Sequence, residues 1–289
     1  MKVAAIQMQG RRWVARIDEA AGLAFPFDIS ESESKAGVVY LLHQQYLPQT
    51  LPAVSLRDVE LLSPIPLPAR NIFCVGKNYY EHAHEFSRSG FDSSAAAGAV
   101  PKHPIIFSKV PGSVVADKSD VVIDPKVSTA IDYEAELAVI IGKAGRGISK
   151  QDAFDHVWGY TIINDVTARD LQGRYSQWLI GKSQDTFCPM GPWAVTKDSF
   201  DLEEASVRCF VNGEIRQNAK VSQLIFDIPT IISTLSEGLT LNVGDIIATG
   251  TPAGVGIGFD PPRYLKAGDT VRVEIDGIGA LENRFVNIN

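Results

Sequence analysis

Three carboxylates in the middle of the chain have a spacing suited to a hard divalent metal ion. Glu134 and Glu136 lie two residues apart in the segment YEAEL, and Asp165 follows in the segment NDVT. Successive side chains of a β-strand point to opposite faces, so the two glutamates share a face and can converge on one ion. That face continues with Ala138 and Ile140. Because a solvated face is expected to stay polar, the pattern predicts carboxylates at the mouth of a buried pocket. The alternative is an ordinary solvated strand, since two glutamates flanking an alanine are common.

A short helix predicted over 79–86 carries a candidate acid–base pair. His82 and Glu85 are three positions apart, so on a helix the carboxylate can orient the imidazole and stabilise its protonated form. This is the arrangement that a general base needs. The alternative is an exposed charged helix with surface histidines. His84 faces elsewhere and is expected to be structural.

Further polar residues follow the third carboxylate. Arg169 and Gln172 lie four and seven residues after Asp165. If this segment turns helical, both share the face of Asp165 and offer a cation and an amide to an anionic ligand. A structural salt bridge from Arg169 is the alternative. Lys182 and Thr251 could also reach such a pocket.

Two glycine motifs do not fit nucleotide-binding sites. The segment GKS at 181–183 has its preceding glycine, Gly173, too far upstream for a phosphate-binding loop. The run GVGIG at 254–258 leads into FDPP, which cannot start the helix that a dinucleotide site requires. Nucleotide binding is therefore not supported.

The elements that must position these residues follow a mostly β pattern. Strands are expected at 72–75, 133–141, 159–164, 206–211, 246–249, 270–275 and 279–286, and helices at 79–86, 150–157 and 229–238. Few helices among many scattered strands predict the α+β class, mostly β, and not a regularly alternating parallel sheet. The loop at 87–103 is expected to be either mobile surface or an active-site cover.

The N-terminal part of the chain is expected to be a small accessory β-region. It contains short β-like runs such as that at 37–42, and the segment SPIPLP at 63–68 predicts a boundary, because proline lacks a ladder donor and keeps its predecessor extended. We therefore predict an accessory β-region at 1–68 and a catalytic domain at 69–289.

The overall composition excludes several classes of protein. The 289 residues are 45% hydrophobic and 21% charged, and no apolar run approaches the length of a membrane span. A formal net charge of −7 argues against nucleic-acid binding, which needs clustered positive charge. No signal-peptide core develops at the N-terminus, and the three widely spaced cysteines fit reduced thiols. These features predict a cytoplasmic location with neither nucleic acid nor membrane as a partner.

Six segments read together resemble the fumarylacetoacetate hydrolase family. In chain order they are IFCVGKNY at 72–79, EHAHE at 81–85, DYEAEL at 132–137, NDVTARDLQ at 164–172, GKSQDTFCP at 181–189 and TGTPAGVG at 249–256. They are similar in particular to its acylpyruvase and 5-carboxymethyl-2-hydroxymuconate isomerase branch, over about 71–286. The resemblance implies a mixed β-sandwich or β-roll catalytic domain and a homodimer.

The resemblance also implies roles for individual residues. A Mg²⁺ or Mn²⁺ would be held by Glu134, Glu136 and Asp165. His82 with Glu85, on a lid segment, would activate water, and Lys182 would stabilise oxyanion charge. The substrate pocket would be lined by Arg169, Gln172 and Thr251. One departure is Val75, where the founding subgroup of the family has a further aspartate ligand; this argues against fumarylacetoacetate itself as substrate.

These roles fit chemistry that passes through a pyruvate enolate. A small anionic 2-oxo acid can chelate a hard cation that keeps open positions, and the enolate charge develops where cation and lysine stabilise it. The leading expectation is a metal-dependent hydrolase that cleaves a C–C bond in a 3-acylpyruvate, in aromatic or sugar-acid catabolism. The alternative is an isomerase of a 2-hydroxymuconate-type dienoate or an oxaloacetate decarboxylase. A catalytically silent metal-binding scaffold is a third interpretation.

Overall fold

The computed structural model of this chain describes residues 1–88 and 100–288. Twelve of the strands found there form one large sheet, with the order β4-β3-β2-β1-β14-β12-β11-β17-β6-β7, while β5 pairs with β1 and β8 with β14. The bounds of these strands are β1 (Lys2–Met8), β2 (Arg11–Asp18), β3 (Leu23–Pro26), β4 (Val54–Ser55), β5 (Glu60–Leu62), β6 (Ile72–Gly76), β7 (Ile105–Lys109), β8 (Val114–Val115), β11 (Ala135–Ile141), β12 (Val157–Asn164), β14 (Cys188–Thr196) and β17 (Ile246–Ala248).

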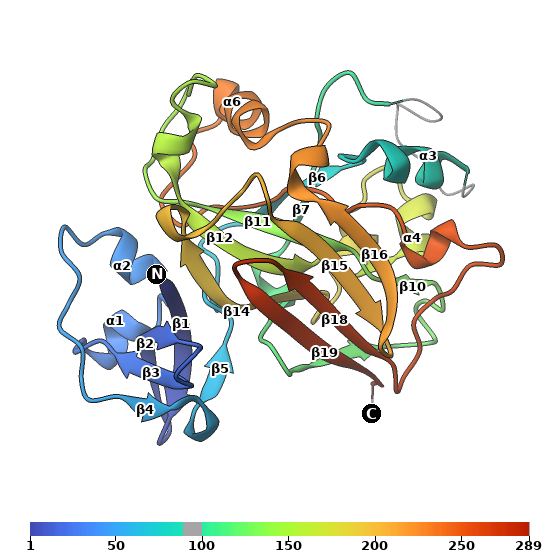
Figure 1. Cartoon of the computed structure of the whole chain (residues 1–289). Coiled ribbons are helices and arrows are strands. Elements are labelled where there is room, and N and C mark those ends of the chain that lie inside the picture. The colour runs from blue at the N-terminus through green and yellow to red at the C-terminus, as the bar shows by residue number, and fades with distance from the viewer. Residues whose placement is uncertain (89–99, 289) are drawn as a thin grey trace.

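A five-stranded sheet packs against the large one, and a two-stranded ladder lies beside the two (Figure 1). The five-stranded sheet has the order β16-β15-β18-β19-β9, and the ladder is β10-β13. Their bounds are β9 (Asp120–Ile123), β10 (Ile131–Asp132), β13 (Thr167–Ala168), β15 (Ser206–Val211), β16 (Glu214–Lys220), β18 (Thr270–Ile275) and β19 (Gly279–Asn287). The expected mostly β, α+β class is confirmed.

Strand β11 is buried on both faces, which explains its nearly continuous apolar sequence. Leu137 and Val139 join the core between the two sheets, together with residues of β15 and β18 such as Val207 and Val273. Ala138 and Ile140 join a second core on the opposite face.

Short helices cover the edges of the sheets (Figure 1). They are α1 (Glu31–Ser34), α2 (Val39–Leu42), α3 (Tyr80–Arg88), α4 (Arg169–Arg174), α5 (Leu179–Lys182) and α6 (Ile228–Gly238), with 3-10 turns η1 (Leu56–Asp58), η2 (Pro111–Ser113), η3 (Ala153–His156), η4 (Lys197–Ser199), η5 (Val221–Gln223) and η6 (Gly256–Gly258). None of these helices, within the described residues, is long and apolar enough to cross a membrane.

The helix expected at 229–238 is confirmed, and its local sequence explains it. Asp227 is the N-cap, whose side chain accepts a hydrogen bond from the Thr230 N–H, and Pro229 occupies the first turn. The strands expected at 206–211 and 270–275 are also found with those bounds.

Three local expectations were wrong. The segment 150–157 holds only the 3-10 turn η3, because Val157 already pairs with Ile141 as the first residue of β12. The run at 37–42 is not a strand but contains α2, whose buried Val38 and Leu41 are three residues apart. The strand expected at 133–141 is interrupted, so that Glu134 lies between β10 and β11. The loop expected at 87–103 falls largely outside the described residues.

The N-terminal strands continue the large sheet. β1 pairs with β14 in antiparallel register, with Lys2 opposite Val195 and Val3 opposite Ala194. The division of the chain at 68 and 69 remains a prediction.

Candidate active site

The three predicted carboxylates meet where β11 and β12 lie side by side. Ala135 pairs with Asn164, and the Asp165 N–H donates to the carbonyl of Glu134 at 2.8 Å, so the ladder continues past both strand ends. One carboxylate oxygen each from Glu134, Glu136 and Asp165 lie within 4.8 Å of one another. All three side chains are buried. The expectation that these residues converge in a buried pocket agrees with this geometry.

Two of the three carboxylates have cationic partners. Glu134 pairs with Lys182 at 2.7 Å and with Arg169 at 2.6 Å. Burial acts to raise the pKa of Glu134, but the charges of Lys182 and Arg169 outweigh it and hold this pKa at about 2. Asp165 pairs with Lys109 at 2.6 Å and with Lys182 at 2.8 Å.

Glu136 is compensated differently. Its carboxylate accepts a hydrogen bond from the Gly250 N–H at 2.8 Å. Burial, followed by the negative charges of Asp165 and Glu134, raises the pKa of Glu136 well above its usual range. Carboxylate oxygens are the ligands that Mg²⁺ and Mn²⁺ prefer, and a divalent cation relieves this kind of repulsion. The donor set therefore fits a hard divalent metal.

Three side chains hold the guanidinium of Arg169 and leave one of its nitrogens, Nη2, for a ligand. Arg169 is the first residue of α4, and its Nε donates to Asp132 at 2.8 Å while Nη1 bonds to Gln172 at 3.0 Å and to Glu134. The Nη2 group is buried with no hydrogen-bond partner among the described residues. An anionic ligand would satisfy it.

Lys182 ends the short helix α5 and is buried. Burial alone would lower its pKa, but the charges of Asp165 and Glu134 outweigh burial and raise it. This lysine is therefore a fixed positive charge beside the carboxylates.

His82 and Glu85 come from α3 and form the predicted pair. His82 is buried, and its Nδ1 lies 3.2 Å from Glu85 Oε2. The Glu85 carboxylate also accepts the Gly254 N–H, at 3.1 Å to Oε1 and 3.2 Å to Oε2. These bonds leave the second ring nitrogen, Nε2, available to a ligand. His84 is exposed on the same helix, as expected of a residue that faces elsewhere.

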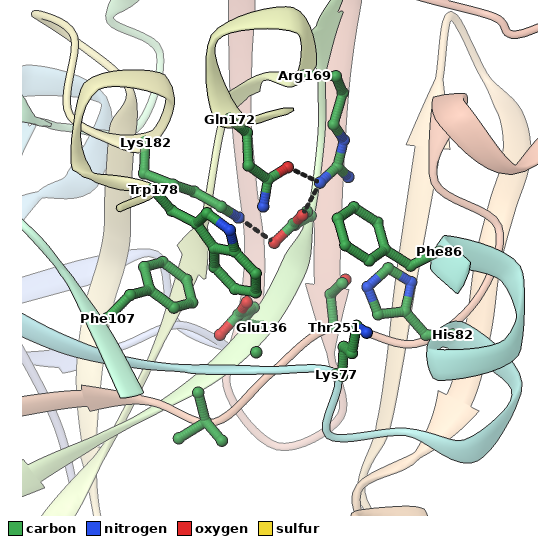
Figure 2. Close-up of a pocket in the computed structure, with 13 residues that line it drawn as sticks. Lys77, His82, Phe86, Phe107, Glu136, Arg169, Gln172, Trp178, Lys182 and Thr251 are labelled. Atoms are coloured by element: carbon green, nitrogen blue, oxygen red, sulfur yellow. Dashed lines mark hydrogen bonds and ion pairs between the residues drawn. The ribbon is translucent and has the colours of Figure 1, made fainter. Parts of the chain in front are cut away.

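These groups line one narrow cavity. Figure 2 shows Arg169, Gln172 and Lys182 on one side of it and His82 with Lys77 on another. Seven of the predicted site residues line it: His82, Glu134, Glu136, Arg169, Gln172, Lys182 and Thr251. Asp165 and Glu85 contact residues that line the cavity: Asp165 contacts Lys182, and Glu85 contacts His82. Thr251 also accepts a hydrogen bond from the Gln217 side chain at 2.8 Å.

Sequence reasoning missed several residues of the site. Lys77 lines the cavity and is buried, although it lies in the quoted segment IFCVGKNY. Lys109 is fully buried, and its ammonium also bonds to the carbonyls of Val166 and Lys182. No local pattern marks Lys109, since its partners are distant in sequence. The aromatic wall was not expected either; it consists of Phe86, Phe107 and Trp178.

Comparisons with known proteins agree with this geometry. A family profile described as fumarylacetoacetate (FAA) hydrolase, C-terminal, matches residues 71–286. The oxaloacetate tautomerase YisK of Bacillus subtilis (strain 168) is 52% identical over 232 residues, which cover 80% of this chain and 74% of the relative. The human mitochondrial oxaloacetate tautomerase FAHD2A is 43% identical over 239 residues, covering 82% of this chain and 72% of the relative.

Two solved structures resemble the whole chain. A fumarylacetoacetate hydrolase from psychrophilic Exiguobacterium antarcticum has a TM-score of 0.85 at 39% identity and covers 100% of both chains. A 5-carboxymethyl-2-hydroxymuconate delta-isomerase from Mycobacterium smegmatis has a TM-score of 0.79 at 30% identity, again covering 100% of both chains.

Proposed function

The chain belongs to the fumarylacetoacetate hydrolase family, and from this premise we propose that it is a metal-dependent isomerase of small 2-oxo acids. The candidate reaction is the interconversion of the keto and enol forms of oxaloacetate or a similar dicarboxylate. Relatives over most of the chain carry the name oxaloacetate tautomerase, and a structural relative is a hydroxymuconate isomerase. These names support the isomerase alternative better than acylpyruvate hydrolysis, our leading expectation from the sequence.

The observation that carries the proposal is the cavity in which His82 faces an anion-binding wall. On that wall the Arg169 Nη2, which has no hydrogen-bond partner in the part of the chain that the structure describes, lies beside Lys182 and the carboxylate triad. A 2-oxo acid has a carboxylate for Arg169 and an acidic proton on C3 for a base. Enolisation needs this combination and no further reactant, whereas hydrolysis also needs a bound water.

We propose that Glu134, Glu136 and Asp165 hold a Mg²⁺ or Mn²⁺ ion, which when bound would stabilise negative charge on the 2-oxo group. Arg169 and Gln172 would bind and orient the carboxylate. His82, held by Glu85, would take the proton from C3 through Nε2, and the electron pair of that bond would form the C2–C3 double bond. The oxygen on C2 then gains a proton, so no atom is gained or lost overall.

The surrounding residues would favour the enolate. Lys182 contributes a fixed positive charge where negative charge develops. Phe86, Phe107 and Trp178 exclude water from the cavity, which strengthens these electrostatic interactions. A homodimer, the state that the resemblance implies, is proposed as well and can be measured by light scattering.

Product analysis tests the proposed reaction. The purified protein with Mg²⁺ should accelerate the disappearance of the ultraviolet absorbance of enol-oxaloacetate over that in buffer, and a chelator should remove the effect. Mass spectrometry should show conserved mass. Release of CO₂ from oxaloacetate, or cleavage of acylpyruvates into pyruvate and a second acid, as the faster reaction would contradict the proposal.

Replacing the base separates its role from metal binding. We expect His82→Asn to lower turnover by about 10²- to 10⁴-fold, the usual contribution of a positioned acid–base group. Its Mn²⁺ affinity, measured by electron paramagnetic resonance, should stay unchanged because His82 is not among the triad. His84→Asn is the matched control on the same helix and should behave as the wild type. Full turnover in His82→Asn would remove this residue from the mechanism.

A further inference from the structure

The glycine run at 254–258, which does not fit a nucleotide site, lies between two parts of the candidate active site. At one end the Gly254 N–H donates to both oxygens of Glu85, at 3.1 and 3.2 Å. In its middle the N–H groups of Gly256 and Ile257 donate to the Asp132 carboxylate, at 2.6 and 3.0 Å. The same loop therefore contacts a carboxylate on the side of His82 and a second one beneath Arg169.

Asp132 connects this loop to the anion-binding wall. Its side chain is fully buried, and Oδ2 accepts the Arg169 Nε–H at 2.8 Å as well as the Ile257 N–H. With Nε fixed there and Nη1 bonded to Glu134, the planar guanidinium has one orientation left. In this orientation Nη2 is the group that has no hydrogen-bond partner in residues 1–88 and 100–288.

Two glycines permit these close approaches. A Cβ at Gly256 would lie 2.4 Å from the Arg263 carbonyl oxygen and 2.7 Å from Asp132 Oδ1, and a Cβ at Gly258 would lie 1.8 Å from Glu85 Oε1. All three distances are shorter than van der Waals contact. At both positions a side chain would therefore collide with a carboxylate that the loop contacts.

We propose that Asp132 is a positioning residue for Arg169. The 254–258 loop then fixes the position of the Asp132–Arg169 pair relative to the His82–Glu85 pair. A substrate carboxylate on Arg169 then places C3 opposite His82. This inference rests on the proposed function for the identity of the substrate, but not for the binding of an anion. It predicts that two parts of the loop control different steps: its middle controls binding through Asp132, and its ends control proton transfer through Glu85.

Asp132→Asn tests the middle of the loop. An amide is neutral and has one acceptor oxygen where the carboxylate has two, so the variant loses the ion pair with Arg169 in either orientation, together with the hydrogen bond from Arg169 Nε or the one from the Gly256 N–H. Oxalate, an enolate mimic, is titrated calorimetrically into the Mn²⁺-saturated protein. We expect its affinity to fall about 10-fold or more, the effect of losing one hydrogen bond to a charged group. Unchanged affinity in a folded Asp132→Asn protein would overturn the proposal.

A double-mutant cycle separates positioning from a merely structural role. If Asp132 acts through Arg169, then adding Asp132→Asn to Arg169→Gln should weaken oxalate binding no further. An equal loss in both backgrounds would overturn the proposal. Should Asp132→Asn fail to fold, as judged by circular dichroism, Gly256→Ala serves instead, because its Cβ would meet the Arg263 carbonyl and the Asp132 carboxylate and so separate the loop N–H groups from Asp132.

Gly258→Ala tests the end that contacts Glu85. The three atoms nearest to its Cβ all belong to the Glu85 side chain, so it should move that carboxylate and leave Asp132 in place. We expect kcat to fall about 10-fold or more, the lower range of acid–base contributions, with oxalate affinity retained. Gly238→Ala, at a glycine surrounded by open space, is the matched control. If the wild type turns over no 2-oxo acid while the oxalate results hold, the proposed function fails and the positioning role survives.

Discussion

Glu136 has the least compensated charge of the three triad carboxylates. Glu134 and Asp165 each contact a lysine, whereas Glu136 is bonded to a backbone N–H and has a raised pKa. Glu136 is thus the side chain that destabilises the metal-free protein, and it is also the one that a bound cation would stabilise most. Function and stability are opposed at this position.

Glu136→Gln should therefore weaken metal binding and stabilise the metal-free protein. The folded state binds the Glu136 proton more tightly than the unfolded chain, whose pKa is near 4.5, so wild-type stability falls as the pH rises above that value. The Glu136→Gln variant has no carboxylate at this position, so its stability does not fall with rising pH in this way. We expect its advantage in unfolding free energy, measured with urea in a chelator, to grow from pH 5 to pH 8 and to reach about 1 kcal/mol or more.

The control for this prediction is Glu237→Gln, at an exposed glutamate of α6. It should show no such pH-dependent difference. Mn²⁺ affinity should fall by about 10-fold or more in Glu136→Gln, since one anionic ligand is lost. A stability advantage that shrinks as the pH rises would show that the repulsion at Glu136 has been misjudged.

At the level of elements, α3 packs against the rest of the site through an apolar cluster around Phe86, in addition to the hydrogen bonds between Glu85 and Gly254. Phe86 is buried with Trp178, Val255 and Ile257, and its ring meets that of Trp178 edge-on with centroids 6.1 Å apart. The helix is short and its mean hydropathy is low, so its own propensity cannot hold it in place. The position of His82 thus depends on where Phe86 packs.

Phe86→Ala should release α3 from the cavity wall. A buried Phe-to-Ala change costs about 3–5 kcal/mol, and here the lost contacts belong to the helix that carries the base. We expect faster amide exchange over 80–87 by mass spectrometry and a lower kcat. Phe154→Ala, at a partly exposed phenylalanine of η3, should leave both unchanged. Unaltered exchange over 80–87 would contradict this account.

The elements also show what the sequence could and could not predict. Strong alternation located β15 and β18, and a cap with proline located α6. The errors came from tertiary constraints. The run at 37–42 forms a helix because Gly37 has a φ of 60° and the Val38 N–H bonds to Pro64. Likewise β12 begins at Val157 because β11 is there to pair with it.

The candidate site was more predictable than the elements around it. The sequence predicts the triad of Glu134, Glu136 and Asp165 from their spacing, because these residues lie at the ends of two neighbouring strands. The sequence does not predict the roles of Lys109 and Asp132, because the partner of each, such as Asp165 or Gly256, is far away in sequence. Buried charge pairs of this kind leave no periodic signal.

At the scale of the whole molecule, the accessory region and the catalytic region share a core. Phe27 and Val38 pack in the same cluster as Ile72, Ala138 and Ile140. Strand β14 also pairs with β1, through Ala194 and Val195. The boundary predicted from prolines therefore divides two segments that bury apolar surface against each other.

A chain of residues 69–289 alone should not fold stably. Without β1, the end of the apolar strand β14 at Ala194 and Val195 becomes an open edge, which is a common cause of aggregation. We expect loss of the near-ultraviolet circular dichroism signal and elution as large aggregates in gel filtration. Addition of a 1–68 chain should restore part of the soluble material. A monomeric, cooperatively unfolding 69–289 chain would show instead that the boundary separates independent domains.

The pairing of β1 with β14 also sets the order of events during synthesis. The terminal ammonium of Met1 bonds to Thr196 Oγ1 at 2.8 Å across 195 residues of chain. At ordinary translation rates the ribosome needs on the order of ten seconds or more to make that intervening stretch. Although β5 pairs with the far end of β1 earlier, Lys2 and Val3 must wait that long for β14, so nascent chains that end before β14 should be clients of ribosome-associated chaperones.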